Sequence, residues 1–379
     1  MLNALTDGTN QFLASLGKSR LDGVRLLFDK EVYATRDQMV YIRPCYEKLY
    51  DKINQNLLIG EKCVVTGTPG IGKSMFGYYA MHRLLDQGIT VIYIYMGWAC
   101  CHLYVPQSPS KLVMETLARL DIPVAETTDG ERWLGRFIPE GIATLVEDSM
   151  ALYSALVELI GDVVVIVDPP RVWGADLFKN PKCGLLMVTS PTPERTTAVK
   201  SEGDAFTLYM PLWSSDEIKN LVRARKNGVD LTEEEKMQLE LRELRFGSIP
   251  RYIAQVKHDH SQMLAIGDNE TKNIIKALSS TKMYEITNPM SVNPDISGRI
   301  IHIEVVNDQL DSFRKRFASE MIERQILVHF HRSERHSWSA FAACVRDVKG
   351  FAAMVGVQSE IGGIPLCKLE ENLVSNNFS

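Results

Sequence analysis

The chain has 379 residues, 45% of them hydrophobic and 23% charged, which is typical of a globular protein with a full core and room for two or three domains. The formal net charge of −5 excludes a global attraction to nucleic acid or anionic membranes, so a nucleic-acid contact would have to be local. No apolar run approaches a membrane span, and we expect no secretory signal at the start. The seven cysteines, odd in number and irregular in spacing, predict reduced thiols.

Residues 1–55 are predicted to be a mixed lead-in. A short strand is expected at 38–43, and a helix begins at Pro44, because proline favours the first helical position. The apolar run at 62–66 then predicts a buried strand.

A glycine-rich loop follows this strand. Its residues fit the phosphate-binding pattern G-x-x-x-x-G-K-[ST] at every fixed position: Gly67, Thr68, Pro69, Gly70, Ile71, Gly72, Lys73 and Ser74. The glycines let backbone N–H groups approach phosphate oxygens, Lys73 brings a positive charge to the β- and γ-phosphates, and Ser74 offers a hydroxyl to Mg²⁺. Helical spacing continues to a stop at Gly88. This strand, loop and helix favour a phosphate site over a glycine turn without a ligand.

A second informative run ends at Asp168. Five β-branched residues at 163–167 predict a buried strand with a carboxylate at its end. Downstream of a phosphate-binding loop, Asp168 is predicted to hold Mg²⁺; the alternative is an ordinary core strand followed by a turn. A strand is also expected at 90–96, and Cys100-Cys101-His102 lacks the second ligand pair that a zinc site would need.

Two further strands are predicted at 184–190 and 206–210. Thr189 or Ser190 would either contact a γ-phosphate and its attacking water or cap the next segment. Helix starts are expected at Ser214, with Glu217 three residues on, and at Thr232. The chain then reads as a connector at 284–298, a strand at 299–306 and helices at about 311–330 and 337–355. We therefore predict a nucleotide-binding core at 56–213, a helical subdomain at 214–283 and a small α+β region at 284–379.

These motifs together resemble the NTPase module of Crinkler-type effectors and retrotransposon-hot-spot proteins. The resemblance covers roughly residues 38–256 and is carried by the motifs at 41–46, 64–74, 187–191, 209–213 with Glu217, and 246–252, together with the strand that ends at Asp168. It implies an α/β fold, a P-loop NTPase with a five-stranded, mostly parallel sheet like that of AAA and signalling ATPases. If the five predicted strands are numbered along the chain, the implied order across the sheet is fifth, first, fourth, third, second. It also implies that Arg251 reaches the nucleotide from the helical subdomain.

The predicted ligands are ATP and Mg²⁺, and the predicted catalytic groups are Lys73, Asp168 and Arg251. ATP is preferred to GTP because the chain lacks an Asn-Lys-x-Asp motif. The resemblance implies action in a nucleus or cytoplasm, with secretion into a host cell as a further implication, although the effector header is absent. Neither a membrane partner nor a particular oligomeric state is indicated.

Alternatives to an ATP hydrolase stay open. Pro169 follows Asp168 where a water-activating Glu often stands, which favours a nucleotide-dependent switch that hydrolyses little; Glu194 would be one substitute for that Glu. A local basic stretch, Arg314-Lys315-Arg316 followed by further arginines and histidines, would allow a DNA or nuclear protein partner, or would simply be a solvated helix face. Neither a P-loop kinase nor a nuclease is favoured by the residues present.

Overall fold

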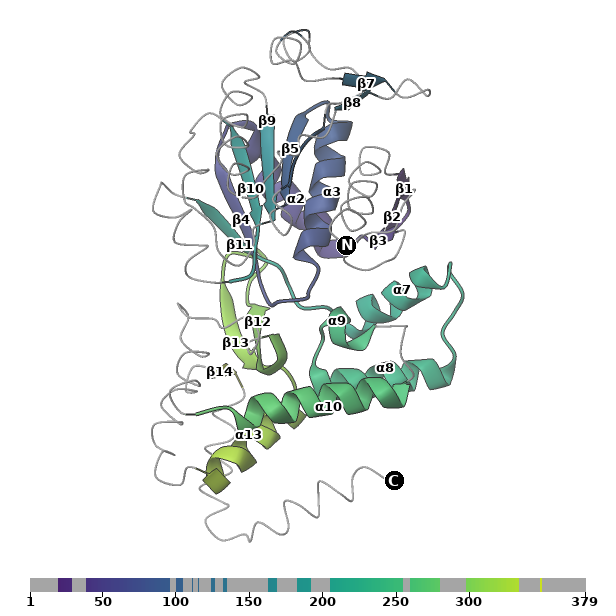
Figure 1. Cartoon of the computed structure of the whole chain (residues 1–379), viewed down its shortest axis with the longest axis vertical. Coiled ribbons are helices and arrows are strands. Elements are labelled where there is room, and N and C mark those ends of the chain that lie inside the picture. Colours follow the sequence, from purple (N-terminus) through teal and green to yellow (C-terminus); the bar gives the residue numbers. More distant parts are fainter. Residues whose placement is uncertain are drawn as a thin grey trace.

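The computed structural model describes residues 20–28, 39–95, 100–104, 111, 115, 124–126, 132–134, 163–168, 183–191, 205–254, 260–279, 298–333 and 348–349. The connector predicted at 284–298 lies outside these residues except for Gly298, and Pro169 and Glu194 lie outside them entirely. Of the helix predicted at 337–355 the structure describes only Val348 and Lys349, and the prediction is wrong there, because these two residues form a strand that pairs with 315–316. In Figure 1 the sheet and its helices form the upper part of the molecule, and a group of helices with a small sheet forms the lower part.

A six-stranded sheet is the centre of the upper part. Its strands are β4 (Lys62–Thr66), β5 (Thr90–Tyr95), β6 (Cys100–Tyr104), β9 (Val163–Asp168), β10 (Gly184–Val188) and β11 (Phe206–Tyr209). They lie in the order β11-β4-β10-β9-β5-β6, and every neighbouring pair is parallel except β5 with β6. The five predicted strands and their implied order are confirmed. The antiparallel edge strand β6, which contains the Cys100-Cys101-His102 run, was not predicted.

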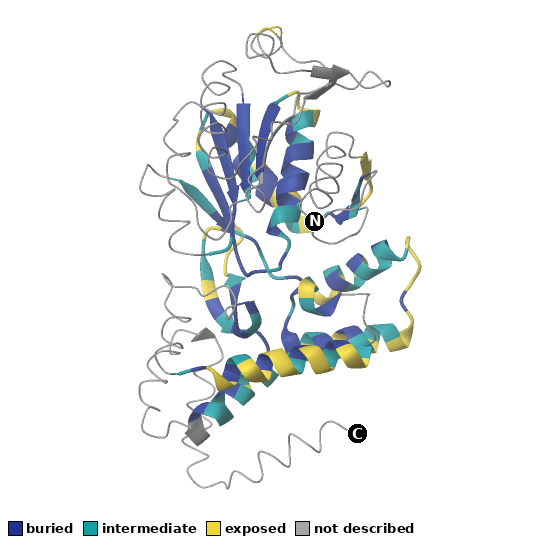
Figure 2. Cartoon of the chain, viewed as in Figure 1, coloured by how far each residue is buried: buried dark blue, intermediate teal, exposed yellow. Residues whose placement is uncertain are grey.

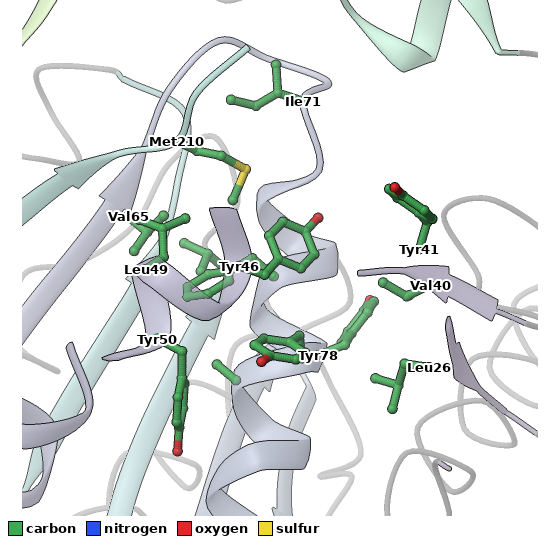
Figure 3. Packing of buried hydrophobic residues seen from close by; sticks show 14 of the residues in the cluster. Leu26, Val40, Tyr41, Tyr46, Leu49, Tyr50, Val65, Ile71, Tyr78 and Met210 are labelled. Atoms are coloured by element: carbon green, nitrogen blue, oxygen red, sulfur yellow. The ribbon is translucent and has the colours of Figure 1, made fainter. Parts of the chain in front are cut away.

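Two helices lie side by side against this sheet: α2 (Pro44–Leu58) and α3 (Lys73–Asp86). Helix α2 begins at Pro44, as the sequence predicted. Its apolar face recurs at helical spacing and is buried, with members Tyr46, Leu49, Tyr50, Ile53 and Leu57. Figure 2 shows the central strands of the sheet and the inner sides of both helices as buried, with β11 mostly intermediate. Figure 3 shows the packing of aromatic and aliphatic side chains between them.

Two small antiparallel sheets complete the upper part. One contains β1 (Arg20–Asp22), β2 (Arg25–Leu27) and β3 (Met39–Tyr41), and the other pairs β7 (Val124–Glu126) with β8 (Arg132–Leu134). Of these, the sequence predicted only β3, as part of the run at 38–43. All five strands are three residues long and carry little periodicity of their own.

The lower part begins with α7 (Ser215–Arg225), α8 (Glu233–Phe246), α9 (Pro250–Ile253) and α10 (His260–Lys276). The predicted helix starts are confirmed: Ser214 with Glu217, and Thr232 with Glu235, each form a capping box in which both reciprocal hydrogen bonds are present. Local side-chain chemistry therefore fixes where α7 and α8 begin.

The C-terminal described residues form β12 (Ile301–Val305), β13 (Phe313–Phe317), α13 (Glu320–Ser333) and β14 (Val348–Lys349). The helix predicted at 311–330 is wrong in its first part, because Phe313–Phe317 is a strand that pairs antiparallel with β12. Residues four apart, such as Phe313 and Phe317, fit either a helix or one face of a strand. This region shares one buried cluster with the end of α10, made of Ile275, Leu278, Ile300, Ile301, Phe317, Ala318, Ile322, Ile326 and Phe330.

Candidate phosphate-binding site

The loop between β4 and α3 has the backbone that its glycines allow. Gly67, Gly70 and Gly72 all have positive φ, and Gly72, at φ 101°, is the residue from which α3 starts. A side chain at this φ would be strained, so glycine is required for the turn into the helix. The N-terminus of α3 thus faces the loop, and its free N–H groups and positive dipole end favour an anion there.

Lys73 lies inside the loop. Its side chain is buried, and Nζ donates hydrogen bonds to the carbonyl oxygens of Gly67 and Thr68, both at 2.9 Å. The ammonium is therefore held over the loop by backbone groups of the loop itself. The role predicted for Lys73, to balance the charge of bound phosphates, stays a prediction.

Ser74 and Asp168 lie at the same edge of the sheet. Ser74 is in the first turn of α3, and Asp168 is the last residue of β9, where its register partner is Tyr95. Strand β10 lies between β4 and β9, so the backbone at Asp168 is two strand spacings, about 10 Å, from the strand that leads into the loop. Carboxylate and hydroxyl oxygens are ligands that suit Mg²⁺.

Thr189 follows β10 between these two points. It is buried, its N–H donates to Val65 O at 3.1 Å, and its hydroxyl donates to Ser190 O at 3.2 Å. This hydrogen bond matches the capping alternative, while the position at the carboxyl edge also matches the phosphate alternative. The choice between them stays a prediction.

Arg251 is brought to the loop from the lower part of the molecule. A Cβ built at Gly70 would lie 3.2 Å from Arg251 Nε and 3.1 Å from Ile249 Cγ2. Helix α9 therefore packs against the middle of the loop. Arg251 therefore lies beside the loop that is predicted to bind phosphate, although it is about 180 positions from Gly70 in the chain.

Arg299 is a neighbouring cation that the sequence analysis missed. Its guanidinium lies 4.2 Å over the ring of Tyr252 and forms an ion pair with Glu270. Burial lowers the pKa of Arg299, and the charge of Arg251 lowers it further, so the two arginines lie close enough to interact. No local motif marks Arg299, because its neighbours come from α9 and α10.

Strand β12 contacts the loop directly. Thr68 is 1% exposed, and its Oγ1 accepts a hydrogen bond from Ile303 N at 2.8 Å. A Cβ built at Gly298 would lie 3.2 Å from Pro69 Cβ. Residues 298–303 therefore pack against the first half of the phosphate-binding loop, a contact between two predicted domains.

The hairpin that follows β12 also contacts the core. Tyr209 N donates to Leu310 O at 2.6 Å, and the rings of Tyr209 and Phe313 are 4.4 Å apart between centroids. The C-terminal region is thus joined to the last strand of the sheet as well as to the loop.

The local basic stretch is partly paired within the described residues. Arg314 and Arg316 both form ion pairs with Glu304, and Lys315 is buried, which lowers its pKa to about 8. Arg335 and His336 lie outside the described residues. The strand arrangement therefore gives the run at 314–316 no continuous basic face.

Comparison with known proteins gives partial likenesses. No family model matches the chain. Crinkler effector proteins 15 and 16 of Phytophthora infestans are each 41% identical over 69 residues, a segment that spans 18% of this chain and 11% of either relative. The chain therefore covers only a small part of the length of these curated relatives.

Three solved structures show weak similarity. The Aeropyrum pernix ORC2 protein, in ADPNP–ADP complexes, is 17% identical with a TM-score of 0.34, over 65% of this chain and 75% of that one. A Walker-type ATPase of Pyrococcus abyssi is 12% identical with a TM-score of 0.37, over 74% and 95%. AMPPCP-bound DnaA of Aquifex aeolicus is 9% identical with a TM-score of 0.35, over 89% and 95%. At these TM-scores the likenesses carry no weight in the argument.

The fold itself is clear from the geometry of this chain. The phosphate-binding pattern lies between the first strand of the sheet and α3, and the strands follow the order of a P-loop NTPase with one added edge strand. Among the described helices, none has the length and apolarity needed to cross a membrane.

Proposed function

We propose that this protein is an ATP-binding P-loop NTPase of the Crinkler and retrotransposon-hot-spot type, which hydrolyses ATP with Mg²⁺. The observation that carries the proposal is the loop at Gly67–Ser74, in which the buried Lys73 is held by two loop carbonyls at the N-terminus of α3. The partial likeness to the Phytophthora infestans effectors supports the choice of family.

The donor set fits a magnesium nucleotide. The hydroxyl of Ser74 and the carboxylate of Asp168 would share Mg²⁺ with phosphate and water oxygens. Bound there, Mg²⁺ would neutralise charge on the phosphates. Loop amides and Lys73 would bind and orient the phosphates, and Arg251 would add a cationic donor from α9.

Steady-state ATP hydrolysis tests the proposal. Lys73→Ala should lower kcat/KM by on the order of a hundredfold or more, since it removes the charge that faces the phosphates. Lys236→Ala, on the exposed side of α8 where it pairs with Glu233, is the matched control and should keep full activity. Equal turnover by Lys73→Ala and the parent protein would refute the proposal.

A hydrolysis-poor switch is the second candidate, motivated by Pro169 after Asp168. Contacts from α9 and β12 on the loop support it, because a bound nucleotide would then touch a point where three parts of the chain meet. Tight ATP binding without single-turnover cleavage would favour this candidate over the hydrolase. Repeating both assays with DNA over a range of salt concentrations would test a DNA partner, since phosphate contacts give a steep negative salt dependence.

We also propose, from the same partial likeness, that the protein acts as an effector in a nucleus or the cytoplasm of a host cell. The location of a tagged protein in such a cell would test this, and exclusion from both compartments would contradict it.

A further inference from the structure

Two aromatic side chains donate hydrogen bonds to consecutive carbonyl groups of the phosphate-binding loop. The hydroxyl of Tyr46 donates to Gly72 O at 2.9 Å, and Nε1 of Trp213 donates to Ile71 O at 2.8 Å. Tyr46 is fully buried and Trp213 is 6% exposed. Figure 3 shows Tyr46 and Ile71 within the same buried cluster. Water is therefore a poor substitute for either donor.

The planarity of the peptide bond gives these contacts a directional effect. In a trans peptide the C=O of one residue and the N–H of the next point in opposite directions. A donor that holds Ile71 O therefore aims the N–H of Gly72 away from Trp213, and a donor that holds Gly72 O aims the N–H of Lys73 away from Tyr46. Both N–H groups belong to the start of α3, where backbone amides bind anions.

We propose that Tyr46 and Trp213 are positioning residues, which orient the Gly72 and Lys73 amides toward the phosphates of the nucleotide. The proposal rests on the proposed function, since it assigns a role within the same phosphate site. It concerns residues that neither the P-loop pattern nor the strand ending at Asp168 includes.

The loop is built to accept the Tyr46 hydroxyl. A Cβ at Gly72 would lie 2.8 Å from Tyr46 Oη, so the glycine leaves the space in which this hydroxyl sits. The ring of Tyr46 packs against Phe76 and Tyr79, with centroids 5.5 and 5.8 Å away. Burial raises the pKa of Tyr46, so the hydroxyl keeps its proton and stays a donor.

Trp213 is held by Arg43. The guanidinium lies 4.5 Å over the indole and donates to the carbonyl oxygens of Pro211 and Leu212, both at 2.9 Å. Arg43 is 1% exposed, and its Nε and Nη2 donate to the two carboxylate oxygens of Glu217 at 3.0 and 3.2 Å. A bidentate pair of this kind fixes orientation as well as distance. Arg43 thereby holds the indole in the orientation in which its Nε1 donates to Ile71 O.

The same arrangement joins the loop to the helical region. Oε2 of Glu217 also accepts from Ser214 N at 2.8 Å as part of the cap of α7. Glu217 thus connects the start of α7, through Arg43 and Trp213, to the carbonyl of Ile71. The motifs at 41–46 and 209–213 meet at this point, under the loop.

Binding of magnesium pyrophosphate tests the proposal with single-atom changes. Tyr46→Phe removes only the hydroxyl, and we expect it to weaken pyrophosphate binding about five- to tenfold in calorimetry, the usual worth of one hydrogen bond. Trp213→Phe removes the other donor and should weaken binding by a similar factor. Tyr50→Phe is the control, because Tyr50 is 1% exposed and its hydroxyl has no hydrogen-bond partner among the described residues; its affinity should equal that of the parent.

Amide spectra separate positioning from general destabilisation. In the parent protein, pyrophosphate should shift the Gly72 and Lys73 amide protons strongly downfield. Tyr46→Phe should reduce the shift of the Lys73 amide. A thermal unfolding curve should show that the variant is still folded. If Tyr46→Phe binds pyrophosphate as tightly as the parent and shows the same Lys73 amide shift, the positioning role is overturned, while the proposed function still stands. A parent protein that binds neither pyrophosphate nor ATP would overturn the proposed function itself. If Tyr46→Phe does not fold, the same two measurements are made on Trp213→Phe, with the Gly72 amide shift in place of the Lys73 shift.

Discussion

Replacing Thr68 with valine removes one acceptor and keeps the shape of the side chain. Thr68 is 1% exposed and Ile303 is 5% exposed, and their hydrogen bond joins the phosphate-binding loop to β12 at 2.8 Å. In Thr68→Val the N–H of Ile303 would stay buried without an acceptor, which costs about 1–3 kcal/mol. We therefore expect the free energy of unfolding to fall by about 2 kcal/mol.

Urea denaturation with an unchanged m-value would measure this loss. Hydrogen exchange would localise it, because the Ile303 amide should exchange faster in the variant. Thr271→Val is the matched control, because Thr271 is 4% exposed and its hydroxyl has no hydrogen-bond partner among the described residues. Loss of this hydroxyl should change the free energy of unfolding by less than about 0.5 kcal/mol. Equal stability of the Thr68 and Thr271 variants, with unchanged exchange at Ile303, would refute the docking of β12 on the loop.

Three further changes test other parts of the structure. Gly247→Ala would place a methyl group 2.1 Å from Ala318 O at φ 75°, so we expect the free energy of unfolding, measured by thermal unfolding, to fall by more than about 3 kcal/mol. Gly228→Ala, at φ 87° in open space, should lower it by only about 1–2 kcal/mol. Equal losses in the two variants would contradict the close packing at Gly247. Burial lowers the pKa of His302 from 6.5 to about 3, so the unfolded chain takes up a proton that the folded protein resists. Stability should then fall by up to about 1.4 kcal/mol per pH unit as the pH drops from 6.5 towards 3, and His302→Leu should flatten this slope in urea denaturation between pH 6.5 and 4; identical slopes would argue against it. Arg251→Ala should weaken ATP binding about ten- to a hundredfold in calorimetry, the worth of a hydrogen bond to a charged group, and an unchanged Kd would remove Arg251 from the site.

Local patterns predicted the elements that local forces decide. The glycine loop, the apolar runs of the central strands and the capping residues Ser214 and Thr232 each specify backbone geometry within a few positions. The implied strand order also agrees with the structure, and it came from the resemblance of whole motifs. The helix expected at 311–330 failed where a pairing partner decided the outcome, since β13 is held by β12.

The motif residues at 41–46 and 209–213 show a different limit. Their sequence marked them as part of a family pattern but gave no role to Tyr46, Trp213 or Arg43. Tyr46 is 26 positions from the carbonyl it contacts, Trp213 is 142 from its own, and Arg43 is 174 from Glu217. Periodicity within a short window cannot report contacts of this length.

By itself, the sequence determined a strand, a glycine loop and a helix in the arrangement of the phosphate-binding pattern, because glycine conformation and the helix N-terminus act over a few residues. Tertiary structure alone decided what surrounds that loop: Tyr46 and Trp213 behind it, β12 against Thr68, and Arg251 beside Gly70. The physical reason is that these contacts depend on buried hydrogen bonds and close packing between distant segments, which exist only once the sheet and the helices have assembled.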